Sequence, residues 1–219
     1  MQADTSKQVN HRDFLPAAGH DLFLPLYDPC VRFMGFDRSR QELIAQANVK
    51  ADQQILDIGC GTGTFVVLLK RQLPSAKVIG LDPDPKALRR AQEKVARAAV
   101  SVQLDRGFSD ELPYKNESFD RVFSSFMFHH LDEQVREKTL KEVLRVLKPG
   151  GSFHLLDFTA EEGAGFVKRF FQSHALTKDN TDERILQQMR RAGLTNAAKL
   201  KEDKMFFGLM QTGYYQAQA

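Results

Sequence analysis

The residues with the clearest chemical potential form a glycine-rich turn in the first third of the chain. Residues 55–63 read Ile-Leu-Asp-Ile-Gly-Cys-Gly-Thr-Gly, and an amphipathic run follows them. The turn contains Gly59, Gly61 and Gly63. Glycine lets the backbone turn sharply and approach a ligand closely, because it has no Cβ atom. An apolar strand, a glycine turn and a helix in this order predict a nucleotide-type pocket at the carboxyl edge of a parallel sheet.

The spacing of the glycines argues against two common classes of ligand. The dinucleotide fingerprint G-x-G-x-x-G needs a glycine one position later than Gly63, where this chain has Thr64. The phosphate-binding P-loop needs a lysine after its last glycine, but Thr64 and Phe65 follow Gly63. The turn therefore favours neither a pyrophosphate nor a triphosphate.

A second carboxylate follows where the next strand is expected to end. Asp82 lies in Gly80-Leu81-Asp82-Pro83-Asp84, after the apolar strand that we expect at Lys77–Leu81. A carboxylate at this strand tip can accept hydrogen bonds from both hydroxyls of a ribose. The alternative is that Asp82 caps the following helix, a role that Asp84 fits better because it directly precedes Pro85.

Four segments together resemble the class I S-adenosylmethionine (SAM)-dependent methyltransferases. They are residues 55–63, 78–84, 111–125 and 143–158, and the last contains Arg-Val-Leu-Lys-Pro-Gly-Gly. The resemblance implies an α/β fold with a Rossmann-like, seven-stranded, mostly parallel sheet and a helical N-terminal cap. SAM is then the expected cofactor, and a SAM-dependent methyltransferase is the expected activity.

Three further features are similar to the methyltransferases of ubiquinone and menaquinone biosynthesis. They are Tyr27-Asp28 before the glycine turn, the double histidine at 129–130, and Leu156-Asp157-Phe158. The resemblance implies that Asp57 lies near the amino group of the cofactor and Asp82 near its ribose; Asp57 could also cap backbone amides of the turn. The expected cofactor-binding residues are Asp57, Gly59, Cys60, Gly61, Gly63, Asp82, Pro83, Phe108, Ser109, Ser125 and Tyr27.

The stretch from Gly107 to Tyr114 departs from the pattern of this family. Phe108 stands where many members have an aspartate that meets the adenine amino group. The aromatic ring could pack on adenine while the backbone of Ser109 recognises it, or it could belong to the core. Asp105 or Asp110 could replace the missing acid.

The two adjacent histidines are the candidate catalytic side chains. In the family this loop lies beside the transferable methyl group, and histidine ordinarily titrates near neutral pH. We expect His130 to be the candidate general base for a hydroxyl or carbon acid. For His129 we expect a structural role, in which it donates to a backbone carbonyl and shapes the loop.

Composition indicates a single-domain protein of modest charge. The chain has 219 residues, is 42% hydrophobic and carries a formal charge of +3, which gives no electrostatic reason to expect a nucleic-acid partner. Cys30 and Cys60 form neither a metal-ligand spacing nor a disulfide framework, and we expect no metal. A polar N-terminus and the lack of 18 consecutive apolar residues favour a cytoplasmic location.

The order of elements predicts three regions: a disordered tail at 1–19, a helical cap at 20–47, and a SAM-binding methyltransferase domain at 48–219. Periodicity predicts a late strand pair at Asn196–Lys201 and Met205–Thr212. The other expected strands are Val100–Leu104, Phe119–Ser125 and Ser152–Asp157, and the expected helices are Pro85–Ala99, Glu133–Leu147, Gly165–Leu176 and Asp182–Ala192.

The expected partner is a small, apolar or amphipathic methyl acceptor: a quinone-like molecule, a lipid or a secondary metabolite. Aromatic residues in 20–47 and 159–180 would form a lid over it. One alternative is a non-catalytic SAM-binding protein. Another is a phospholipid N-methyltransferase with weak membrane-surface contact, since residues 166–171 mix basic and aromatic side chains. The sequence gives no oligomeric state.

Overall fold

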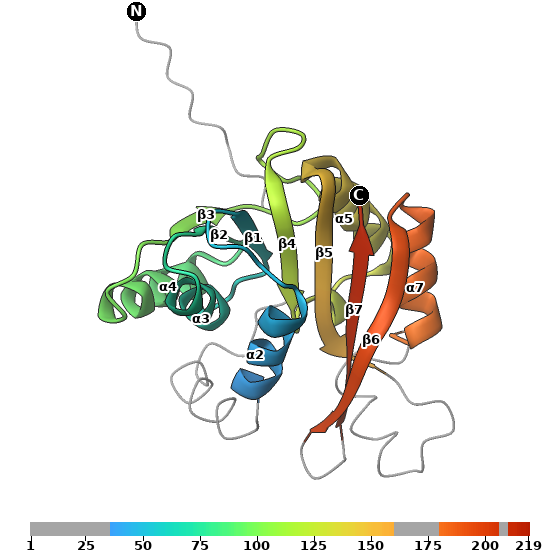
Figure 1. Cartoon of the computed structure of the whole chain (residues 1–219), viewed down its shortest axis with the longest axis horizontal. Helices are drawn as coiled ribbons and strands as arrows, with labels where there is room; N and C mark the ends of the chain where they lie inside the picture. The colour runs from blue at the N-terminus through green and yellow to red at the C-terminus, as the bar shows by residue number, and fades with distance from the viewer. Residues whose placement is uncertain (1–35, 160–179, 206–209) are drawn as a thin grey trace, which may run out of the picture.

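The computed structural model describes residues 36–159, 180–205 and 210–219. These residues form one seven-stranded sheet in the order β3-β2-β1-β4-β5-β7-β6, with helices on both faces (Figure 1). The strands are β1 (Gln54–Ile58), β2 (Lys77–Asp82), β3 (Gln103–Arg106), β4 (Phe119–Ser125), β5 (Leu147–Phe158), β6 (Thr195–Met205) and β7 (Met210–Gln218). The helices are α2 (Phe36–Gln46), α3 (Thr64–Gln72), α4 (Pro85–Arg97), the 3₁₀ turn η2 (Phe128–His130), α5 (Glu133–Val146) and α7 (Asp182–Arg191).

The first five strands are parallel, and β7 is antiparallel to both of its neighbours, β5 and β6. This confirms the expected Rossmann-like, mostly parallel sheet. The central strand β1 is almost continuously buried, as a strand covered by helices on both faces must be. The carboxyl ends of the parallel strands meet at one edge, which is the lower edge in Figure 1.

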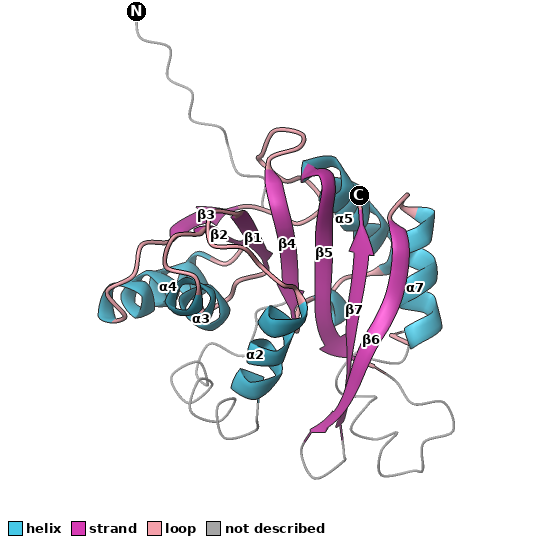
Figure 2. Cartoon of the chain, in the orientation of Figure 1, coloured by secondary structure: helices cyan, strands magenta, loops and turns pink. Residues whose placement is uncertain are grey.

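Helices lie on both faces of the sheet (Figure 2), and an apolar core lies between helices and sheet on each face. One joins α2, α3 and α4 to the sheet, for example through Leu43, Phe65 and Leu88. The other joins α5 and α7 to the sheet through residues such as Leu140 and Ile185. Successive strand residues alternate between these cores, because side chains in a strand point to opposite faces.

Most predicted elements are found at the expected positions, and helix capping follows the sequence. Asp84 caps α4, since its carboxylate accepts from the amide of Lys86 at 2.8 Å. Gly193 follows α7 with a φ of +96°, a conformation suited to the residue after a helix. Residues 165–176, expected to be helical, lie outside the described residues.

Several strand boundaries differ from the prediction; for example, the strand expected at Asn196–Lys201 runs from Thr195 to Met205. The third strand begins at Gln103 instead of Val100, because Gln103 is the first residue to pair with β2. The last strand is Met210–Gln218 instead of Met205–Thr212: Met205 pairs with Met210, so the apolar run spans the end of the hairpin. β5 begins at Leu147 instead of Ser152, because Leu147 pairs with Phe119 before an irregularity in the register.

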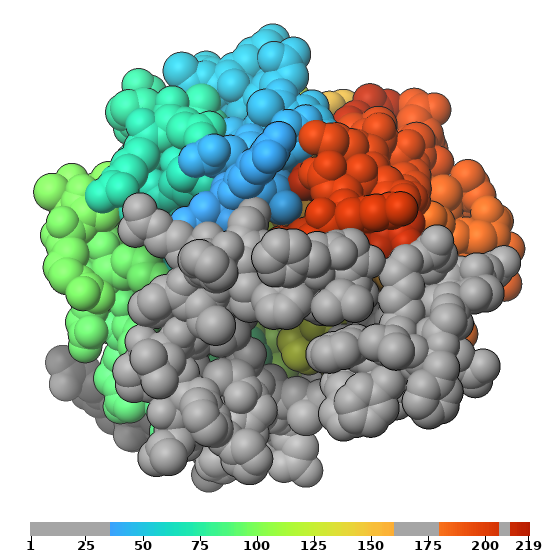
Figure 3. All heavy atoms as spheres, turned by 90° about the horizontal axis from the view of Figure 1, so that it is seen from below, coloured from blue at the N-terminus to red at the C-terminus, as the bar shows by residue number. Residues whose placement is uncertain are grey.

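The helical cap is described only from Phe36 onward, where α2 is helical as expected. α2 lies at the carboxyl edge of the sheet beside β6 (Figure 3). An ion pair at 3.4 Å between Glu42 of α2 and Lys201 of β6 joins the two elements. The boundaries of the tail, the cap and the methyltransferase domain remain predictions. In the part of the chain that the structure describes, no helix is long and apolar enough to cross a membrane.

Candidate active site

The glycine turn between β1 and α3 is fixed to the end of β2 by backbone amides. The amides of Gly59 and Cys60 both donate to the carbonyl of Leu81, at 2.8 and 3.0 Å. The amide of Gly61 donates to Oδ2 of Asp82 at 2.8 Å. The structure therefore brings these predicted site residues together at the carboxyl edge of the sheet.

The three glycines of the turn all have positive φ angles, but they differ in how closely other residues pack against them. The φ angles are +73° at Gly59, +53° at Gly61 and +79° at Gly63. An added Cβ would lie 2.4 Å from Cγ of Met127 at the first glycine, and 2.8 Å from Cβ of Ala91 at the third. At Gly61 nothing in the described chain lies within 4 Å of that position. Gly61 therefore borders open space, whereas Gly59 and Gly63 allow close packing.

Asp82 is a buried carboxylate with spare acceptor capacity. Its Oδ1 accepts from the amide of Asp84 at 2.9 Å and its Oδ2 accepts from Gly61. Burial raises the pKa of this carboxyl to about 6, although the two amides oppose the shift. A carboxylate has about four lone-pair sites, so two amides leave room for hydroxyl donors.

Asp57 and Arg40 are two buried, charged side chains whose polar atoms are not all satisfied. Both carboxylate oxygens of Asp57, and Nε and Nη1 of Arg40, have no hydrogen-bond partner in the described chain. Nη1 of Arg40 does lie 3.6 Å from Oδ1 of Asp37. Burial raises the pKa of Asp57 well above its usual range; the charge of Arg40 opposes this shift and Asp82 adds to it. Unsatisfied buried groups of both signs favour a ligand that carries both an ammonium and a carboxylate.

The stretch after β3 lies beside Asp82, since the amide of Gly107 donates to the carbonyl of Asp82 at 3.2 Å. The hydroxyl of Ser109 is 2.8 Å from that of Thr139 on α5, so its side chain is engaged with the helix. Phe108 next to it is half-buried.

Three other residues named in the sequence analysis have defined surroundings at this end of the site: Asp105, Cys60 and Pro83. Asp105, one of the alternative acids, accepts from the Tyr114 hydroxyl at 2.9 Å and from the Gln103 amide at 2.8 Å. Burial raises the pKa of the Cys60 thiol well above its usual range. The backbone of Cys60 is engaged within the turn, since its amide donates to the carbonyl of Leu81 and its carbonyl accepts from the amide of Gly63 at 2.9 Å. Pro83 accepts a hydrogen bond from Nε of Arg106 at 3.2 Å.

His129 is paired with a carboxylate at the carboxyl ends of β4 and β5. Its Nδ1 lies 2.5 Å from Oδ1 of Asp157, and its amide donates to Oδ2 at 2.9 Å. Asp157 is fully buried and also accepts from the amide of Phe158 at 2.7 Å. The expected backbone-carbonyl partner of the His129 ring is thus wrong: the partner is a carboxylate. Nε2 of His129 has no hydrogen-bond partner among the described residues.

His130, the predicted base, lies beside this pair. Its ring centroid is 4.0 Å from that of His129, and its Nδ1 is buried with no hydrogen-bond partner in the described chain. Burial, and then the neighbouring His129, lower the pKa of His130 to about 4. Its imidazole is therefore neutral near pH 7 and a weak proton acceptor. Ser125, the last residue of β4, is also buried.

Aromatic rings form an apolar wall next to the histidine pair. Phe126 lies 4.6 Å from Phe36 and 5.0 Å from Phe158 between ring centroids, and Phe158 lies 5.1 Å from His129. Phe126 has a φ of +56°, a strained conformation for a bulky side chain. Strain of this kind persists where surrounding structure enforces it, and functional sites are one common setting.

Comparison with known proteins agrees with this geometry. The family model described as "Methyltransferase domain" matches residues 55–151. A demethylmenaquinone methyltransferase from Deinococcus radiodurans is 33% identical over 186 residues, which cover 81% of this chain and 76% of that protein. This chain belongs to the SAM-dependent methyltransferases. Within them it is similar to the type found in quinone biosynthesis.

Solved structures show the same overall fold. YcgJ from Bacillus subtilis superposes with a TM-score of 0.71 at 18% identity, covering 83% of this chain and 98% of that one. Phosphoethanolamine N-methyltransferase 2 from Haemonchus contortus, in complex with SAM, superposes with a TM-score of 0.68 at 18% identity, covering 83% and 52%. The cofactor of this methyltransferase is SAM.

The residues at the carboxyl edge fit SAM. The open space at Gly61 admits a ligand against the backbone, and Asp82 has acceptor capacity for a ribose. The unsatisfied groups of Asp57 and Arg40 match the ammonium and carboxylate of a methionine moiety. Sequence reasoning missed Arg40, because a single arginine on an amphipathic helix gives no signal. Tyr27 lies outside the described residues.

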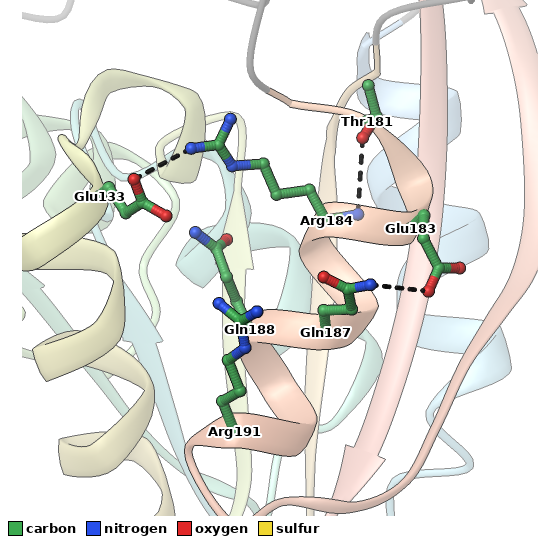
Figure 4. Close-up of a pocket in the computed structure, with 7 residues that line it drawn as sticks. All are labelled: Glu133, Thr181, Glu183, Arg184, Gln187, Gln188 and Arg191. Atoms are coloured by element: carbon green, nitrogen blue, oxygen red, sulfur yellow. Dashed lines mark hydrogen bonds and ion pairs between the residues drawn. The ribbon is translucent and has the colours of Figure 1, made fainter.

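A polar pocket lies between the start of α5 and α7 (Figure 4). Its volume is about 390 Å³, and its lining includes Glu133, Arg184, Gln188 and Arg191. Two of these lining residues, Glu133 and Arg184, form an ion pair at 3.0 Å. None of the predicted site residues lines it, so it is separate from the methyltransferase site.

Proposed function

We propose that this methyltransferase methylates a quinone-like aromatic molecule that carries an ionisable hydroxyl. The named activity of its relatives supports an acceptor of this class, a demethylated quinone. Phe36, Phe126 and Phe158 are buried against one another beside His129, so the surroundings of the candidate base are apolar, as a flat apolar acceptor requires. A small-molecule acceptor is thus the expected partner.

The observation that carries this proposal is the contact between His129 and Asp157. Methylation at a ring carbon beside a hydroxyl is easier after the hydroxyl loses its proton, because the resulting oxyanion makes the carbon nucleophilic. Nε2 of His129 takes that proton, and Asp157 holds Nδ1–H and stabilises the imidazolium. A primary amine needs such a base less, since its lone pair is already available when it is neutral.

The remaining residues bind and position. When bound, SAM supplies a methyl group on a positively charged sulfur. Asp82 would accept hydrogen bonds from the ribose hydroxyls, Asp57 would hold the ammonium and Arg40 would hold the carboxylate. The methyl group would pass to the ring carbon, and neutral S-adenosylhomocysteine would depart. The proton on that carbon would pass to solvent as aromaticity is restored, and the proton held by His129 would return to the hydroxyl oxygen. Correct placement of the two reactants can supply roughly 7–11 kcal/mol of the barrier reduction.

The test is an assay of S-adenosylhomocysteine formation with a panel of acceptors. The panel contains a reduced demethylated naphthoquinone, the same compound with both hydroxyls blocked as methyl ethers, and phosphoethanolamine. We expect turnover with the free hydroquinone alone. Turnover with the blocked ether or with phosphoethanolamine, and none with the hydroquinone, would contradict the proposal.

A further inference from the structure

Arg136 on α5 is a buried cation that contacts the histidine loop at several points. It is only 4% exposed. Its Nε donates to the carbonyls of Phe128 and Leu131, at 3.1 and 2.8 Å, and its Nη2 donates to the carbonyl of His129 at 3.3 Å. The guanidinium also lies 5.2 Å from the centre of the Phe128 ring. One side chain thus holds the backbone on both sides of the histidine pair.

Asn180 extends this contact to the strand that carries the carboxylate. Its side-chain Oδ1 accepts from Nη1 of Arg136 at 3.2 Å. Its side-chain Nδ2 donates to the carbonyl of Phe158, the residue directly after Asp157. Asn180 is fully buried. The chain of contacts therefore runs from the loop of His129, through Arg136 and Asn180, to the end of β5.

We propose that Arg136 and Asn180 are positioning residues that hold His129 in register with Asp157. The inference rests on the proposed role of His129 as the base. The two partners of that contact lie on separate elements, η2 and β5, and a short 3₁₀ turn has weak internal hydrogen bonds. A guanidinium presents a rigid fork of donors, so one arginine can fix several carbonyls in a single geometry.

A purely structural role for the two side chains predicts something different. If they only stabilised the fold, their loss would lower the melting temperature and leave the rate of the folded enzyme unchanged. A positioning role predicts a loss of kcat in protein that is folded and binds cofactor normally. Displacement of a catalytic group by about 1 Å can cost about 100-fold in rate.

The start of α5 and α7 offers a matched control. Glu133 and Arg184 join the same two regions by an ion pair on the surface (Figure 4), and the Glu133 side chain is 61% exposed. This pair contacts neither the carbonyls of the histidine loop nor that of Phe158 in the contacts described. The variant Glu133→Gln therefore loosens the junction of the helices without touching Arg136 or Asn180, which together form the proposed clamp.

The experiment compares four variants of the full chain: Asn180→Ala, Asn180→Asp, Arg136→Lys and Glu133→Gln. Asn180→Asp keeps the acceptor for Arg136 and loses the donor to Phe158, so it carries the test if the alanine variant does not fold. We expect kcat to fall about 10- to 100-fold in the first three variants. Affinity for S-adenosylhomocysteine, measured by calorimetry, should stay within about twofold of the wild type, because the cofactor residues are not in contact with the clamp. Glu133→Gln should behave as the wild type.

A spectroscopic measurement is independent of turnover. A short hydrogen bond from imidazole to carboxylate places its proton far downfield in the NMR spectrum, and His129→Gln identifies that resonance. We expect the clamp variants to lose or broaden it. If Asn180→Asp and Arg136→Lys keep both the resonance and kcat, the clamp is wrong. If His129→Ala remains fully active while the clamp variants still lose the resonance, the proposed base is wrong and the clamp stands.

Discussion

Two adjacent histidines have different surroundings at the carboxyl end of β4. His129 contacts a buried carboxylate, and its other ring nitrogen has no partner in the described chain. The buried Nδ1 of His130 has no such contact, and its pKa is lowered to about 4. A carboxylate fixes the tautomer of an imidazole and stabilises its charged form, which makes His129 the better candidate for proton transfer.

We therefore expect the two histidines to differ in their effect on turnover. His129→Ala and Asp157→Asn should lower kcat about 100- to 1000-fold, the usual contribution of a general base. His130→Gln should lower it by about tenfold or less and leave its pH dependence unchanged, because a neutral imidazole does not titrate near pH 7. The measurement is the rate of S-adenosylhomocysteine formation between pH 5 and 9. A larger loss in His130→Gln than in His129→Ala would reverse the assignment.

Asp82 gives the cofactor site a predicted pH dependence. Its pKa in the free protein is raised to about 6 by burial, and hydroxyl donors from a ribose stabilise its ionised form. Binding should therefore be constant above pH 6 and should weaken by up to about tenfold per pH unit as the pH falls below 6. Calorimetric titration with S-adenosylhomocysteine between pH 5 and 8 measures this slope.

The controls at this position separate charge from packing. Asp82→Asn should bind more weakly and lose the pH dependence, since an amide does not titrate. Asp82→Ala should weaken binding at pH 8 by about tenfold or more, a loss of about 1.4 kcal/mol. If the affinity of Asp82→Asn for S-adenosylhomocysteine still falls with pH as in the wild type, another group causes the pH dependence.

At the scale of elements, the glycine turn offers a matched pair of substitutions. An added Cβ at Gly63 meets Ala91 of α4, whereas one at Gly61 meets nothing in the described chain. Gly63→Ala should lower the free energy of unfolding by about 1–3 kcal/mol, the usual cost of overpacking. Gly61→Ala also strains a positive φ but should chiefly weaken SAM binding, because its methyl group enters the ligand space. Thermal unfolding and calorimetry of both variants test this, and equal effects on stability and binding would contradict it.

The position of α2 predicts which part of the cofactor Arg40 contacts. This helix lies at the carboxyl edge and brings a buried guanidinium near Asp57, as the charge effect on that carboxyl shows. Arg40→Met should weaken S-adenosylhomocysteine binding about 10- to 100-fold, the value of a hydrogen bond to a charged group. Binding of methylthioadenosine, which lacks the carboxylate, should change little. If the affinity for both ligands falls equally, Arg40 does not contact the carboxylate of the cofactor.

For the whole molecule, cofactor binding should appear as thermal stabilisation. A ligand present at about 100 times its Kd stabilises the folded state by about 2.7 kcal/mol, which raises the melting temperature of a domain of this size by about 5–10 °C. We expect this shift with SAM and S-adenosylhomocysteine but not with NAD, because the third glycine is one position too early for a pyrophosphate. A comparable shift with NAD would contradict the assignment of the pocket.

The alternation of strands and helices could be predicted well, and the edges of the sheet less well. The central strands are short, apolar and bounded by turn residues, so local pattern is sufficient for them. β7 was misplaced because Met205–Met210 is a single apolar run, and only the pairing of its two ends shows that a hairpin divides it. Strand register depends on contacts between segments, which a local pattern does not contain.

Within the site too, residues in local sequence patterns could be predicted, and residues that depend on contacts between distant segments could not. The amino-acid sequence by itself determined the glycine turn, the acid at the tip of the second strand and the parallel sheet, because backbone sterics and hydrophobic periodicity act over a few neighbouring residues. The tertiary structure alone decided that His129 meets Asp157 across 28 residues and that Arg136 meets Asn180 across 44. Such contacts form only when packing brings distant segments together, so they depend on the whole fold.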